Sequence, residues 1–133
     1  MSNPAILLVA RIFMSIMFLM AGFAKLGAVG GTIGYFTSLG LPAPNLLVWV
    51  IIALEIGGGI AILTGFMTAQ FSYALAGFCI AAGFIGHFDP SDQSQMNAFM
   101  KNITIAGGFL VLAVMGPGAW SLDARRSASL HPA

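Results

Sequence analysis

The stretch LLVWVIIALEIGGGIAILTG, residues 46–65, is apolar throughout except for one carboxylate, Glu55, near its middle. A run of about 20 such residues matches the roughly 30 Å hydrocarbon core of a bilayer, so the stretch predicts a membrane-spanning helix. A charged side chain at that depth is costly unless another group pairs with it. The identity of that partner is the first question that the sequence raises.

The composition of the whole chain is also that of a membrane protein. Of the 133 residues, 59% are hydrophobic and only 7% are charged, whereas a soluble domain carries about 25% charged residues. The five basic residues are too few and too scattered for a nucleic-acid-binding surface. The single cysteine, Cys79, cannot form an internal disulfide or a CxxC pair, so any electron chemistry would require a bound cofactor or a partner.

Four long apolar runs predict an all-α fold, an integral membrane four-helix bundle. The predicted spans are residues 5–24, 46–65, 69–87 and 96–115, within a single domain of residues 1–120. The remaining residues, 121–133, form a polar C-terminal tail that we expect to be frayed.

Two of the connections carry recognisable helix signals. In the first outward loop, Ile33 and Phe36 fall at helical spacing ahead of Gly40, which predicts a short amphipathic helix lying in the membrane interface. In the last loop, either Asp92 or Ser94 can cap the helix that follows.

The basic residues predict the direction in which the chain crosses the membrane. Four spans place both termini on one side, and positive charges favour the cytoplasm. We therefore expect both termini in the cytoplasm. Arg11, Arg125 and Arg126 then lie on the cytoplasmic side of the membrane, and Lys25 and Lys101 lie on the opposite side.

Charged residues within the spans predict an ion pair. Arg11 and Lys25 share one face of the first span, and Glu55 shares a face with Gly58 and Gly59, where another helix can approach closely. At a helical rise of about 1.5 Å per residue, Arg11 and Glu55 lie at depths that an arginine side chain can bridge. We therefore predict that they pair inside the bundle, either to fix helix register or to take part in function.

A second polar group is expected at the outer ends of the spans, where Lys25, His87, Lys101 and Asn102 fall at similar depth. Together they predict a donor-rich pocket that suits a quinone carbonyl, a small oxyanion or the carboxylate of a partner. The alternative is that the lysines merely extend to the lipid headgroups. No metal site is predicted, because His87 and Asp89 are the only well-placed ligands and a closed zinc site takes about four.

The chain resembles the DoxX family of small four-helix bacterial membrane proteins, over residues 6–118. The resemblance rests on four fragments in order: RIFMSIMFLMAGFAKL (11–26), YFTSLGLPAP (35–44), LEIGGGIAILTG (54–65) and FMKNITIAGGFLVL (99–112). It implies a place in the bacterial inner membrane and an oxidoreductase role in concert with partner proteins. Relatives are linked to a thiosulfate:quinone oxidoreductase and to complexes that handle thiol and superoxide stress, whereas distant members act as chaperones or cargo receptors.

These observations favour two functions over a third, transport of a small solute, because four spans from one chain seldom enclose a pathway unless the chain forms an oligomer. In the first, the protein is a quinone-linked redox subunit, in which Glu55 and His87 exchange protons with a quinone that Lys25, His87, Lys101 and Asn102 bind. Its partners are the lipid bilayer and either other membrane proteins of a redox complex or further copies of the chain. In the second, it is a non-catalytic accessory or assembly subunit whose glycine-rich faces pack against a larger membrane complex.

Overall fold

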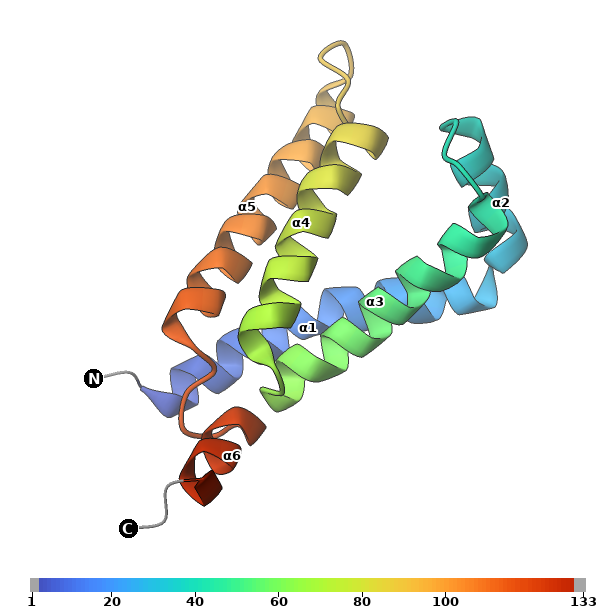
Figure 1. Ribbon diagram of the computed structural model, residues 1–133. Coiled ribbons are helices and arrows are strands. Elements are labelled where there is room, and N and C mark those ends of the chain that lie inside the picture. Colours follow the sequence, from blue (N-terminus) through green and yellow to red (C-terminus); the bar gives the residue numbers. More distant parts are fainter. Residues whose placement is uncertain (1–2, 131–133) are drawn as a thin grey trace.

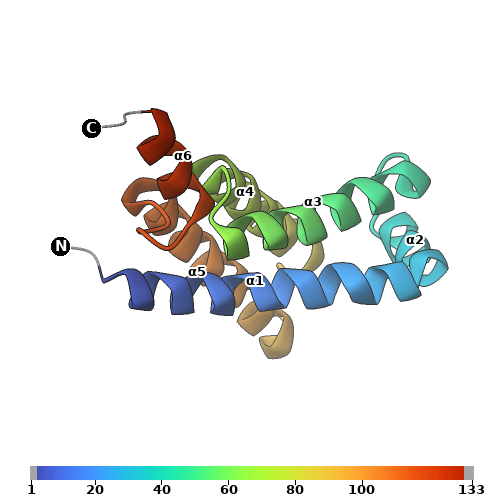
Figure 2. The ribbon, with the colours of Figure 1, turned by 90° about the horizontal axis from the view of Figure 1, so that it is seen from below.

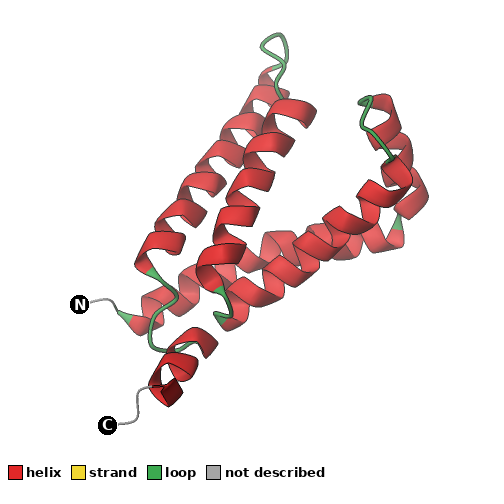
Figure 3. Cartoon of the chain, viewed as in Figure 1, coloured by secondary structure: helices red, strands yellow, loops and turns green. Residues whose placement is uncertain are grey.

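The computed structural model describes residues 3–130, which form six helices joined by short loops (Figures 1 and 3). Four helices are long and apolar enough to cross a membrane. They are α1 (Pro4–Gly27), α3 (Pro44–Thr64), α4 (Thr68–Gly86) and α5 (Gln93–Met115). Two shorter helices are α2 (Val29–Ser38) and α6 (Leu122–Leu130). The all-α membrane fold and the short helix in the first loop are therefore confirmed.

Local chemistry explains where several helices begin. The side chain of Asn3 accepts hydrogen bonds from free backbone N–H groups in the first turn of α1. Pro4 occupies the first position of the helix, where a backbone N–H group would have no partner within the helix, so its absence in proline costs nothing. Of the two predicted caps for α5, Asp92 takes the role, because its carboxylate accepts from the backbone of Ser94 and Gln95. Helix α3 begins at Pro44 and ends before Gly65, whose φ of 68° reverses the chain into α4.

The four long helices form two antiparallel pairs that splay apart. Helix α1 packs along α3, and α4 packs along α5. The pairs meet near the tight α3–α4 turn and diverge toward α2 and the α4–α5 loop (Figure 1). Figure 2 shows α5 passing across α1 rather than along it. The bundle is thus wedge-shaped, with its closed end beside the N-terminus and α6.

Close packing fixes the register between α1 and α3. A Cβ atom at Gly59 would lie 2.8 Å from the side chain of Leu19, and one at Gly22 would lie 3.2 Å from the Cβ atom of Glu55. Two glycines on opposite helices therefore let the backbones approach, as in other membrane helix pairs. Because the helices are antiparallel, this register places Gly22 and Glu55 at the same depth.

The largest apolar core lies where the two pairs meet. Phe18 from α1, Leu75 from α4 and Phe109 from α5 are almost fully buried, and the rings of Phe18 and Phe109 pack edge to face with centroids 5.4 Å apart. A second, smaller cluster anchors α2, where Phe36 packs on Val48 and Ile52. The wedge is therefore held mainly at its closed end, whereas the buried apolar side of α2 packs on α3.

Candidate functional site

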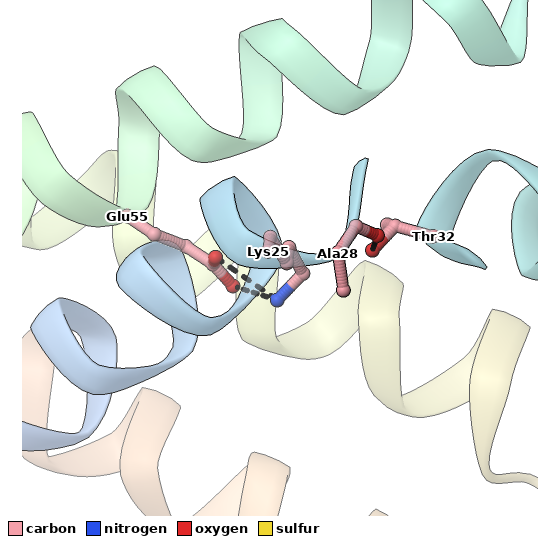
Figure 4. A network of polar contacts seen from close by, with 4 residues as sticks. All are labelled: Lys25, Ala28, Thr32 and Glu55. Carbon is pink, nitrogen blue, oxygen red and sulfur yellow. Dashed lines mark hydrogen bonds and ion pairs between the residues drawn. The ribbon is translucent and has the colours of Figure 1, made fainter. Parts of the chain in front are cut away.

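The partner of Glu55 is Lys25, at the end of α1 (Figure 4). The lysine Nζ lies 2.9 Å from Oε1 and 3.0 Å from Oε2 of the carboxylate. The Glu55 side chain is only 4% exposed, whereas that of Lys25 is 24% exposed. The carboxylate is therefore enclosed between helices, whereas the side chain of its lysine partner keeps an exposed part.

The predicted Arg11–Glu55 pair is wrong, and the direction of the side chains explains why. Gly22 lies opposite Glu55, and Arg11 lies eleven residues earlier, about 16 Å away along the helix. Helical side chains also tilt toward the N-terminus of their own helix. Because α1 and α3 are antiparallel, Arg11 and Glu55 point away from each other, while Lys25 points back toward Glu55.

Arg11 instead stabilises the closed end of the wedge. Its guanidinium, fully buried, donates from Nη1 to the carbonyl of Leu63 at 3.3 Å and from Nη2 to the carbonyl of Trp120. Leu63 lies in the last turn of α3, where unpaired carbonyls and the helix dipole favour a cation. Arg11 therefore joins α1, the end of α3 and the segment that follows α5.

The same end is completed by α6, in the segment that the sequence led us to expect frayed. Asp123 accepts hydrogen bonds from the backbone N–H groups of Met67 and Thr68 at 2.8 and 2.9 Å, and from the Thr68 hydroxyl at 2.8 Å. Its own N–H donates to the carbonyl of Gly65 at 2.9 Å. Since no neighbouring side chain caps α4, Asp123 supplies that cap from 55 residues away. Residues 131–133 of the predicted tail lie outside the described residues.

Removing this remote cap should produce a pH-dependent loss of stability. Desolvation raises the pKa of Asp123, but hydrogen bonds from Thr68 and Met67 and the charge of Arg126 together hold it below its ordinary value of 3.8. A carboxyl with a lowered pKa stabilises the fold above that value and loses its effect as the pH falls below it. We expect Asp123→Ala to cost about 1–2 kcal/mol at pH 7, with the difference from wild type shrinking below pH 3.8.

Thermal unfolding in detergent over a series of pH values measures this effect. The matched control is Asp89→Ala, because within residues 3–130 the Asp89 carboxylate accepts hydrogen bonds only from Ser91, in an exposed turn. A pH-independent loss in the Asp123 variant would contradict the role of its charge.

The four residues predicted to bind a ligand are distributed over the two helix pairs. Lys25 bonds to Glu55 on the α1–α3 pair, whereas His87, Lys101 and Asn102 belong to the α4–α5 pair. The Nδ1–H of His87 donates to Oε1 of Gln95 at 2.8 Å, and Asn102 donates to the carbonyl of Ala98 one turn away. None of the hydrogen bonds in residues 3–130 links one of these four residues to another. Their role in ligand binding stays a prediction.

Helix α2 brings a further polar group toward the open end. A Cβ atom at Gly86, the last residue of α4, would lie 3.2 Å from the hydroxyl of Tyr35. Tyr35 therefore reaches from the α1–α3 pair to the end of α4, next to His87. Sequence reasoning did not single out Tyr35, because its place after Gly34 in an apolar loop gave no signal of this contact.

Comparisons with known proteins agree with the fold. A protein-family model described as DoxX matches residues 6–88. The chain is 44% identical to the inner membrane protein YqjF of Escherichia coli K12 over 116 residues, which are 87% of this chain and 88% of that protein. It is 37% identical to the inner membrane protein YphA of the same organism over 130 residues, covering 93% and 92% of the two chains. No solved structure matches the chain.

Proposed function

Because the chain belongs to the DoxX family of inner membrane proteins, we propose that it is a membrane subunit that binds a quinone and works with a redox partner. The observation that carries the proposal is the Lys25–Glu55 pair, a buried carboxylate joined to a half-buried ammonium within an apolar helix pair. Ionisable groups inside a membrane protein are costly to keep and are commonly functional.

The chemistry of the pair suits a quinone head group. An ammonium has three N–H donors, and the open side of Lys25 leaves a donor for a quinone carbonyl. Interconversion of quinone and quinol moves two electrons and two protons. In this proposal Glu55 exchanges one proton with a quinone oxygen, and the second passes to the aqueous side through His87, whose ring nitrogen Nε2 is not used in its bond to Gln95.

The electrons must come from or go to a partner protein. Cys79 is the single cysteine of the chain and is 1% exposed in the apolar core, so it offers no dithiol chemistry. The proposed partner therefore carries an electron-transfer cofactor. This division places quinone binding and proton exchange in the present chain and electron transfer in its partner.

Quinone extraction after purification in mild detergent tests this function. We expect about one quinone per wild-type chain, and at least a tenfold lower content in the double variant Lys25→Gln/Glu55→Gln, which removes both charges without stranding either. Arg125→Gln is the matched control, because Arg125 is an exposed cation on α6. Wild-type protein that is folded but free of quinone would contradict the proposal.

A second function, that of a non-catalytic accessory subunit, is favoured by a different observation. A Cβ atom at Gly57, Gly77 or Gly107 would meet nothing within 4 Å, so three membrane-spanning helices carry open glycine positions. Such positions let a helix of another protein approach closely. Large subunits that co-purify in fixed ratio with quinone-free protein would favour this function over the first.

A further inference from the structure

A groove that runs along α5 and reaches α1 at one end is not used by the Lys25–Glu55 pair. It consists of two adjoining hollows of about 430 and 280 Å³, both of which include Thr104 and Ile105. We call it the α1–α5 groove. Its lining residues are Asn97, Met100, Lys101, Thr104, Ile105 and Gly108 of α5, with Phe13, Met14 and Met17 of α1.

Polarity changes along the length of this groove. Asn97, Lys101 and Thr104 follow one another at intervals of four and three residues, so they share one face of α5 in its half nearer the α4–α5 loop. Gly108 continues that face, and beside it the groove is lined by the side chains of Met14 and Met17. On a mainly apolar lining, the groove therefore carries a cation and an amide at one end and is apolar at the other.

The charge of Lys101 is uncompensated. No hydrogen bond or ion pair within residues 3–130 involves its ammonium group, and no acidic residue lines the groove. The amide oxygen of Asn97 accepts from Gln93, which leaves the Asn97 amide N–H groups as donors one turn from the lysine. An anion with hydrogen-bond acceptors complements this end, whereas a neutral quinone head would leave the charge unmatched.

The dimensions match a lipid. From Asn97 to Gly108 the groove extends about 16 Å along α5, close to the depth of one leaflet of a roughly 30 Å hydrocarbon core. Flexible methionine side chains adapt well to an irregular alkyl chain. The wedge between the helix pairs also opens in the direction of the polar end (Figure 1).

We propose that the α1–α5 groove binds an anionic phospholipid from the leaflet on the side of the α4–α5 loop. Its phosphate contacts Lys101 and the Asn97 amide, and one acyl chain runs between Ile105 of α5 and Met14 and Met17 of α1. The lipid fills the space where the two helix pairs diverge. This site is separate from the Lys25–Glu55 pair and does not depend on the quinone proposal.

Native mass spectrometry with phosphatidylglycerol and phosphatidylethanolamine tests the charge at this site. We expect the wild-type protein to retain phosphatidylglycerol about fivefold better, in line with one cation at an anionic membrane surface. Lys101→Gln should abolish the preference, whereas Arg125→Gln, which removes an exposed cation on α6, should keep it. Equal retention of the two lipids, or a preference lost only in the Arg125 variant, would overturn the proposal.

A matched pair of glycine variants tests the shape of the groove. Gly108→Leu fills the groove beside Met14, whereas Gly107→Leu adds the same side chain where a Cβ meets nothing within 4 Å. Only the first should reduce retention of both lipids, while melting temperatures verify that both variants fold. Displacement of the lipid by stoichiometric quinone, or dimerisation through α1 and α5 when lipid is removed, would show a different occupant and contradict the proposal.

Discussion

Gly65→Ala is expected to lower the free energy of unfolding by about 3–5 kcal/mol, a large fraction of the stability of a small protein. Gly65 has a φ of 68°, which an alanine adopts only with strain. A Cβ atom there would also overlap Nη1 of Arg11 and the Cβ atom of Ser121. The substitution would push both groups away from the α3–α4 turn, so Arg11 would lose its hydrogen bonds at the closed end of the wedge.

Substitutions at two further glycines separate the backbone strain from the steric overlap. Gly40 has a φ of 70° and open space where a Cβ would lie, and the bond from the Leu41 N–H to the Phe36 carbonyl ends α2 as the bond from the Phe66 N–H to the Ala61 carbonyl ends α3. Gly40→Ala therefore measures the backbone strain alone, about 1–2 kcal/mol. Gly57 is helical and also faces open space, so Gly57→Ala should be neutral or slightly stabilising. The measurement is reversible unfolding in mixed detergent micelles. A Gly65 variant no less stable than the Gly40 variant would refute the proposed overlap.

The sequence was sufficient to predict five of the six helices in residues 3–130, all except α6, because bilayer thickness and turn chemistry act locally. Each apolar run is long enough to span the membrane, and the Gly65 region and Asp92 mark boundaries within a few residues of where helices end or begin. The short helix before Gly40 follows from spacing in the same way. These features depend on neighbours in the chain, so the sequence alone carries the signal.

The contacts between helices could not be derived in the same way. Arg11 and Glu55 were paired from their approximate depths, but the register of α1 and α3 depends on the fit of Gly22 and Gly59, and the tilt of side chains reverses between antiparallel helices. Lys25 shares a face of α1 with Arg11, and the tilt of helical side chains toward the N-terminus favours Lys25 as the partner of Glu55. The sequence held no comparable signal for Asp123, because it caps a helix that begins 55 residues earlier.

The Lys25–Glu55 pair should show a strongly asymmetric response to substitution. Lys25→Met leaves a buried carboxylate without its partner and should cost about 3–5 kcal/mol of unfolding free energy. Glu55→Met leaves a lysine that is already 24% exposed and can extend toward the headgroups, so it should cost only about 1 kcal/mol. The double variant replaces the pair with two apolar side chains of similar volume, and its stability should return close to that of the wild type.

A double-mutant cycle in mixed micelles measures this coupling, which we expect to exceed 2 kcal/mol in magnitude. The control cycle combines Arg11→Met with Glu55→Met. Arg11 bonds to Leu63 and Trp120 and shares no partner with Glu55, so those two losses should add within about 0.5 kcal/mol. Strong coupling of Glu55 to Arg11 and none to Lys25 would instead support the Arg11–Glu55 pair that was predicted from the depths of the two residues. Coupling confined to Lys25 would show that the buried carboxylate pairs with the end of α1 on the side where the helix pairs diverge.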